Sequence, residues 1–161
     1  MKYFSGFCLK EEKELFKDFL EEKEFVVAGF SYGAQKALDY VLDCKTRVDK
    51  LQLISPAFFT YPERIIKMNL EFFERDKEKY LQNFFKKCGF FNEKYIGDCE
   101  IGDLKALFSY DWKKIEKLKN VKLEVFLGEE DKIISIKSAR EFFKTYGHVY
   151  LIKKANHFLR S

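Results

Sequence analysis

The chain has 161 residues, of which 47% are hydrophobic and 35% charged, and its formal net charge is +4. This composition fits one folded globular domain, and the charge is too small and too evenly mixed with acids to favour nucleic-acid binding. No apolar run approaches the roughly 20 residues that span a bilayer, and the N-terminus lacks the apolar core of a signal peptide. We therefore expect a cytoplasmic protein with no membrane segment.

Short apolar segments alternate with helical patterns along the chain. Helical spacing of apolar residues runs from about Lys10 to Glu22, again after Ser31, and again from Ile136 to Phe143. Strands that alternate with helices indicate βαβ units. We predict an α/β fold with a mostly parallel five-stranded sheet and helices on both faces. The five expected strands are Lys2 to Phe4, Phe25 to Phe30, Leu51 to Ser55, Leu123 to Leu127 and Val149 to Ile152.

One connection is far longer than a crossover between two strands requires. The chain from Pro56 to Asn120 has helical periodicity throughout. A helical insertion after a strand of a parallel sheet commonly covers the edge that carries an active site. We interpret residues 57–120 as a helical lid within a single domain 1–161.

The segment Gly29-Phe30-Ser31-Tyr32-Gly33 follows an expected strand and precedes an expected helix. In a G-x-S-x-G turn the serine at the tip has an unfavourable backbone conformation, and small residues such as Gly29 and Gly33 avoid a collision. The following helix directs its N-terminal amides to the same point. The pattern predicts Ser31 as a nucleophile; a serine that only caps the helix is the alternative.

A serine nucleophile needs a base to remove its proton, and the chain has two histidines. His148 precedes the last expected strand, whereas His157 follows it at the carboxyl end. Catalytic groups of open parallel sheets gather at the carboxyl ends of the strands, where Ser31 also lies. We predict that His157 is the base and that His148 is a surface residue.

The base in turn needs an orienting acid. In proteins whose nucleophile lies in a G-x-S-x-G turn between a strand and a helix, this acid stands between the serine and the histidine in chain order. Asp131 stands in a loop at the carboxyl end of the strand Leu123 to Leu127. We predict Asp131 as the acid, with Glu129 and Glu130 as second choices. An aspartate that only caps the helix beginning near Ser135 is the alternative.

Two backbone amides are required to bind the oxyanion of an acyl-transfer reaction. One belongs to the residue after the nucleophile, which is Tyr32. The other comes from a loop after an early strand, here Ser5-Gly6-Phe7-Cys8. Gly6 allows the backbone to turn, and Phe7 is expected to supply the amide.

Cysteine and histidine are too sparse to suggest a metal site. The four cysteines, Cys8, Cys44, Cys88 and Cys99, contain no C-x-x-C pair. We expect free and mostly buried thiols, with Cys8 packed in the core, and neither a metal nor another cofactor.

The chain resembles the α/β-hydrolases and, among them, the compact pimeloyl-acyl-carrier-protein methyl ester esterases of bacterial biotin synthesis. It departs from the general hydrolase pattern in lacking the leading antiparallel strands and the usual His-Gly of the oxyanion loop. The resemblance runs nearly end to end. Its segments are Tyr3-Phe4-Ser5-Gly6-Phe7, Gly29-Phe30-Ser31-Tyr32-Gly33, Ser55-Pro56, Gln82-Asn83-Phe84-Phe85, Glu124-Val125-Phe126-Leu127-Gly128, Gly128-Glu129-Glu130-Asp131 and Asn156-His157-Phe158-Leu159.

This resemblance implies a serine esterase with Ser31, Asp131 and His157 as its triad. The implied substrate is a methyl-capped pimeloyl chain on acyl carrier protein, and the products are methanol and the free pimeloyl carrier protein. Acylated carrier protein is the implied partner, with no nucleic acid and no membrane. Arg64, Arg75 and Lys87 could contact that acidic partner, although a solvated helix face also explains them.

Phenylalanine pairs of the insertion could line a channel for the acyl chain or could simply pack a small core. They are Phe58, Phe59, Phe72, Phe73, Phe84 and Phe85. Two other functions stay open: a serine hydrolase of different specificity, such as a thioesterase or small-ester carboxylesterase, and a non-catalytic interaction protein on the same fold.

Overall fold

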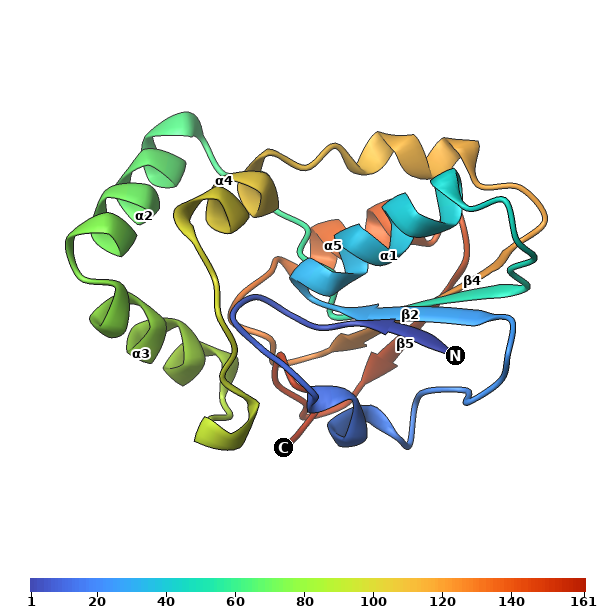
Figure 1. Cartoon of the computed structure of the whole chain (residues 1–161), viewed down its shortest axis with the longest axis horizontal. Coiled ribbons are helices and arrows are strands. Elements are labelled where there is room, and N and C mark those ends of the chain that lie inside the picture. Colours follow the sequence, from blue (N-terminus) through green and yellow to red (C-terminus); the bar gives the residue numbers. More distant parts are fainter.

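The computed structural model describes all 161 residues and is built on a five-stranded sheet, shown in Figure 1. The strands lie side by side in chain order, and all four pairings are parallel. All five carboxyl ends therefore meet at one edge. The expected strands are confirmed, with each end shifted by at most one residue: β1 Lys2–Phe4, β2 Val26–Phe30, β3 Lys50–Ile54, β4 Lys122–Gly128 and β5 His148–Ile152.

Helices lie on both faces of the sheet but cover them unequally (Figure 1). The helices α1 (Tyr32–Asp43) and α5 (Ile136–Phe143) cover one face, as their apolar spacing predicts. The other face carries the short 3-10 helix η1 (Glu12–Phe16). Successive side chains of a strand point to opposite faces. At the end of β2, Gly29 therefore abuts α1, while the Phe30 ring packs 4.7 Å from that of Phe16.

The helix expected from about Lys10 to Glu22 is wrong, because only the turn η1 forms there. A side chain of the sheet satisfies backbone groups near the end of this segment. Gln52 donates to the Phe19 carbonyl at 3.2 Å and accepts from the Glu21 amide at 2.8 Å. These bonds tie the segment to β3 as an irregular loop and outweigh its helical periodicity.

The insertion between β3 and β4 contains α2 (Glu63–Arg75), α3 (Lys77–Cys88), the 3-10 helix η2 (Glu93–Tyr95), α4 (Ile101–Ser109) and the 3-10 helix η3 (Trp112–Lys117). The α2–α3 pair extends beyond the carboxyl edge of the sheet (Figure 1). By contrast, η3 contacts α1, and the Trp112 indole donates to the Ala57 carbonyl at 2.9 Å. The last part of the insertion thus packs with the body of the protein.

The expectation of four free thiols is wrong for two of them. Cys8 and Cys99 form a disulfide between the loop after β1 and the segment before α4, whereas Cys44 and Cys88 are free. The two bonded residues are 91 positions apart, and spacing along the sequence gives no sign of such a pair. Because Cys8 is bonded, packing alone does not explain its burial. No helix of the chain combines the length and apolar character needed to cross a membrane.

Candidate active site

Ser31 lies at the tip of the turn between β2 and α1, with a φ of 53° and a ψ of −113°. A φ in this range is uncommon for a residue with a side chain. The backbone of Ser31 is held on both sides, because its amide donates to Ile54 and its carbonyl accepts from Ala34 and Ala57. Its side chain makes no capping bond to α1, so helix capping does not explain this serine.

The glycines on either side of Ser31 let three backbone segments come close together. A Cβ on Gly29 would lie 2.2 Å from the Gly33 carbonyl oxygen, and one on Gly33 would lie 2.1 Å from that of Phe4. Both contacts are with backbone, which cannot rotate away. The start of α1 is therefore packed directly against the chain that leaves β1.

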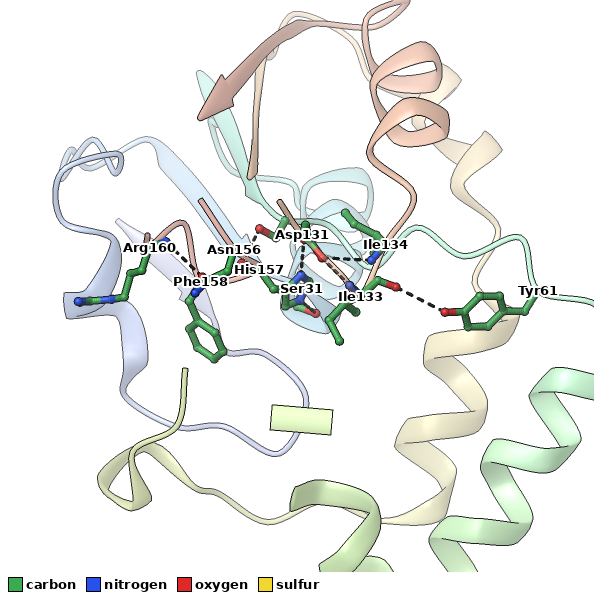
Figure 2. Close-up of polar contacts among 10 residues, drawn as sticks. Ser31, Tyr61, Asp131, Ile133, Ile134, Asn156, His157, Phe158 and Arg160 are labelled. Atoms are coloured by element: carbon green, nitrogen blue, oxygen red, sulfur yellow. Dashed lines mark hydrogen bonds and ion pairs between the residues drawn. The ribbon is translucent and has the colours of Figure 1, made fainter. Parts of the chain in front are cut away.

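His157 follows β5 and lies beside Ser31, as Figure 2 shows. Its Nε2 is 3.0 Å from the Ser31 Oγ. His148 is exposed at the opposite end of the same strand. The two histidines thus occupy the positions expected from the sequence.

Asp131 lies in the loop after β4, and its side chain is fully buried. Its Oδ2 is 2.6 Å from the His157 Nδ1, while its Oδ1 accepts from the amides of Ile133 and Ile134 at 2.7 and 3.2 Å (Figure 2). Ser135, not Asp131, caps α5. Glu129 and Glu130 are exposed, so the structure brings Asp131 alone of the three acids to the histidine.

The three side chains are joined by two hydrogen bonds whose donors and acceptors can be assigned. An ionised carboxylate can only accept hydrogen bonds, so Nδ1 of His157 donates to Asp131 and Nε2 is left to accept from the Ser31 hydroxyl. Ser31 and His157 are 3% and 1% exposed. Such an arrangement can raise the nucleophilicity of the hydroxyl in a site from which water is largely excluded.

A contact that the sequence analysis missed fixes the backbone of His157. Ser55 is fully buried at the end of β3, and its hydroxyl donates to the His157 carbonyl at 2.7 Å. Its position after β3 matches that of Ser31 after β2, and this common edge was the available signal. Asn156 adds a second restraint, since its Oδ1 accepts from the amides of Phe158 and Arg160 (Figure 2).

The two amides expected at an oxyanion site lie on neighbouring segments. Tyr32 is the first residue of α1, so its amide has no carbonyl partner within the helix. The Phe7 amide makes no hydrogen bond within the chain, although Phe7 is 2% exposed. Gly33 lies close to the Phe4 backbone, so the start of α1, which contains Tyr32, is packed beside the chain that leads from β1 to Phe7.

A cavity of about 500 Å³ lies between the insertion and the loops of the carboxyl edge. Three of the six phenylalanines considered for an acyl channel, Phe59, Phe72 and Phe84, line it. The other three pack elsewhere. They are Phe58, which contacts Phe142 and Phe143, and the buried Phe73 and Phe85.

Three lysines, Lys86, Lys87 and Lys132, also line the cavity, and no aspartate or glutamate does. Ser31 and His157 are not part of its wall; Phe7 and Ile133 are. Arg64 and Arg75 are exposed on α2 outside this cavity, and neither they nor Lys87 form an ion pair. Lys132 was not among the basic residues expected from the sequence to contact a ligand or partner.

Several solved structures resemble this one. An esterase from Exiguobacterium antarcticum superposes with a TM-score of 0.67 at 17% identity, over 90% of this chain and 63% of its own. BioG from Haemophilus influenzae gives a TM-score of 0.63 at 15% identity, over 98% and 87% of the two chains. MenH from S. aureus gives 0.63 at 13% identity, over 96% and 85%. The chain has the α/β-hydrolase fold.

The chain is short for this fold. It spans less than two thirds of the length of the Exiguobacterium antarcticum esterase, but most of the length of BioG and MenH. Neither the protein-family models nor the curated protein sequences match the chain. No group of three or more histidine, cysteine, aspartate or glutamate side chains is placed to hold a metal ion.

Proposed function

We propose that this α/β-hydrolase is a serine esterase in which Ser31, His157 and Asp131 act as the catalytic triad. The proposal is based on the buried hydrogen bonds of His157, whose Nε2 lies 3.0 Å from the Ser31 Oγ and whose Nδ1 lies 2.6 Å from the Asp131 Oδ2. The esterase from Exiguobacterium antarcticum has the same fold, which supports the class of reaction.

The reaction begins when the Ser31 oxygen attacks the ester carbonyl while His157 takes its proton. Asp131 stabilises the imidazolium that results. The carbonyl oxygen becomes an oxyanion, which the amides of Tyr32 and Phe7 would bind. His157 then gives its proton to the departing alcohol, leaving Ser31 acylated. A water molecule, deprotonated by His157, attacks the acyl group and releases the acid and free Ser31.

The cavity is the proposed acyl site. Its aromatic wall suits a hydrocarbon chain, and its three lysines suit an anionic group carried by the same ligand. Ser31 and His157 are almost completely buried, so an ester can reach them only if the neighbouring segments move. We therefore propose that the α2–α3 pair serves as the lid.

The proposed substrate is the methyl ester of a pimeloyl chain carried on acyl carrier protein, in biotin synthesis. Support for it comes from the sequence resemblance to esterases of that pathway and from the near end-to-end likeness to BioG in fold. The exposed, unpaired Arg64, Arg75 and Lys87 would meet the acidic carrier protein. We place the reaction in the cytoplasm, as expected from a sequence without a membrane-length apolar run or the apolar core of a signal peptide.

The carrier-bound substrate itself provides a test, because it contains two bonds that a serine hydrolase could cut. Hydrolysis of the methyl ester releases methanol and leaves the acyl group on the carrier protein, whereas hydrolysis of the thioester releases a free carrier thiol. We expect intact-mass analysis to show loss of the methyl group alone. Release of the whole acyl group would identify a thioesterase. Short-chain esters cleaved faster than the carrier-bound ester would identify a small-ester carboxylesterase.

A further inference from the structure

We propose that Glu12 is a positioning residue that holds the loop after β1 so that the Phe7 amide faces the oxyanion. Glu12 itself makes no hydrogen bond to Ser31 or His157. The proposal rests on the proposed function, since it takes the Phe7 amide as an oxyanion donor.

Glu12 is a buried carboxylate for which the triad has no use. It is 0% exposed at the start of η1. Its Oε1 accepts from the Gly6 amide at 2.8 Å and from the Tyr3 hydroxyl at 2.9 Å, while its Oε2 has no hydrogen-bond partner. Burying a carboxylate with an unsatisfied oxygen costs free energy. A function at this position would account for that cost.

The bonds at Gly6 set the orientation of the Phe7 amide. A peptide unit is planar, so fixing one of its polar groups also fixes the other. Glu12 fixes the Ser5–Gly6 unit through the Gly6 amide. The Leu9 amide, which donates to the Gly6 carbonyl at 3.1 Å, fixes the Gly6–Phe7 unit. The Phe7 amide is left without a partner and with a defined direction.

Gly6 needs such an external restraint because of its own flexibility. A Cβ at this position would lie 2.7 Å from the Phe30 ring, so the packing favours glycine. Glycine also has the widest range of backbone conformations. Burial raises the pKa of Tyr3 well above its ordinary value, and the nearby charge of Glu12 raises it further. Tyr3 therefore stays a neutral hydrogen-bond donor to the same Glu12 oxygen that accepts from Gly6.

The other attachments of the loop lie on either side of Gly6. Phe4 and Ser5 pack against Gly33, and the Cys8 carbonyl accepts from the Gly97 amide at 2.9 Å. Glu12 is the contact that acts on the Gly6 amide itself.

The test compares Glu12→Met, which has no strong acceptor, with Glu12→Gln, which keeps an acceptor oxygen. With p-nitrophenyl butyrate as substrate, we expect Glu12→Met to lower kcat by roughly 10- to 100-fold with KM within about twofold. Complete removal of an oxyanion donor costs about 10²- to 10³-fold. Glu12→Gln should keep kcat within about fivefold of the wild type. Glu124→Met is the matched control, because Glu124 is 6% exposed and bonds to Gln52, away from the loop.

A second measurement separates positioning from general loss of structure. An octyl trifluoromethyl ketone adds to the active serine and places an oxyanion where the tetrahedral intermediate would have it. Its inhibition constant should rise with Glu12→Met by the same factor as kcat falls, and should stay unchanged with Glu124→Met. If Glu12→Met does not fold, Glu12→Asp carries the test, since its shorter carboxylate loses reach to Gly6.

The outcomes distinguish the two proposals. A wild type that neither cleaves esters nor binds the ketone overturns the proposed function. An active wild type, together with unchanged kcat and ketone binding in both Glu12→Met and Glu12→Asp, overturns the role of Glu12 alone. Equal losses in Glu12→Met and Glu124→Met would show a structural role and would likewise overturn it.

Discussion

Ser31 is kept in a strained conformation by its neighbours. A non-glycine residue in a sparsely populated region costs about 1–3 kcal/mol, and the backbone bonds of Ser31 to Ile54, Ala34 and Ala57 offset this cost. In this conformation the hydroxyl makes no capping bond to α1 and lies 3.0 Å from the His157 Nε2. Gly33 makes the conformation possible, because it lets the Phe4 backbone approach the turn.

Gly33→Ala should therefore reduce both stability and activity. The new Cβ would lie 2.1 Å from the Phe4 carbonyl oxygen, and relief requires β1 or α1 to shift. We expect a loss of about 1–3 kcal/mol in the free energy of unfolding, measured by urea denaturation. Gly102→Ala is the control, since a Cβ there meets nothing within 4 Å. Equal stability of the two variants would contradict the close packing of the turn.

Asp131 has two tasks, because one oxygen binds the loop amides and the other binds His157. Asp131→Asn keeps the shape but cannot stabilise the imidazolium, so we expect kcat for ester hydrolysis to fall by about 10⁴-fold. Glu130→Gln, an exposed neighbour, should have no effect. A large loss with Glu130→Gln and none with Asp131→Asn would move the acid to another residue.

The hydrogen-bonded set of Ser31, His157 and Asp131 could be selected from sequence as the candidate triad, whereas its supports could not. Chain order and the carboxyl edge were enough to select Ser31, Asp131 and His157. The contacts of Ser55 and Glu12 depend on side-chain direction across strands far apart in the chain, which periodicity does not report.

The loop after β1 is fastened to the insertion as well as to the sheet. Leu9 forms an antiparallel bridge with Ile96 next to the Cys8–Cys99 disulfide. A covalent link between residues 91 positions apart restricts the unfolded chain strongly. The loop after β1 and the segment before α4 are thus expected to move together.

Cys99→Ser should lower the free energy of unfolding by roughly 2–5 kcal/mol. Urea denaturation of the oxidised wild type, with and without dithiothreitol, should show a similar difference. Cys44→Ser keeps the bond and should still respond to the reductant. No response of the wild type would show that the disulfide does not form.

Because disulfides are rare in the cytosol, trapping thiols in fresh lysate also tests the cytoplasmic location.

Strands were easier to predict than the segments between them. The apolar run of β2 has only five residues and includes two valines and a phenylalanine, a length and composition typical of a buried strand. The apolar spacing between Lys10 and Glu22 is typical of a helix, but Gln52 of β3 forms hydrogen bonds with the backbone of this segment. A tertiary contact of this kind overrides local propensity.

At the scale of the whole molecule, a cluster of ion pairs lies near the amino ends of β3 and β4, at the opposite end of these strands from the candidate active site. Lys50 of β3 forms ion pairs with Glu21 and Glu124, and Gln52 donates to Glu124 at 2.9 Å. Bonds from Lys23 and Lys50 lower the pKa of Glu21 to about 2. Burial raises the pKa of Glu124, but hydrogen bonds from Gln52 and Lys50 outweigh it, so its net shift is downward.

This cluster predicts how stability depends on pH. Both folded carboxyls have a pKa below their ordinary value of 4.5, so the unfolded chain binds more protons as the pH falls through this range. Stability from the cluster is present above pH 4.5 and is lost progressively toward pH 2. The urea midpoint of the wild type should fall over this window, and that of Lys50→Met should fall less. Parallel curves would contradict the ion pairs.

The size and general position of the insertion were predictable, because a helical run from Pro56 to Asn120 cannot be a simple crossover. How the insertion divides into parts that pack in different places was not predictable. That η3 packs beside α1 while α2 and α3 extend beyond the sheet depends on tertiary contacts such as that of Lys114 in η3 with Asp39 in α1.

Fluorophosphonate labelling tests the identity of the nucleophile most directly. Phosphonylation requires a serine whose proton is taken by a base, so the probe should modify the wild type at Ser31. Peptide mass analysis should locate the adduct there, and Ser31→Ala and His157→Ala should abolish or strongly slow the labelling. A folded wild type that takes no label, or takes it at another residue, would contradict the proposed esterase.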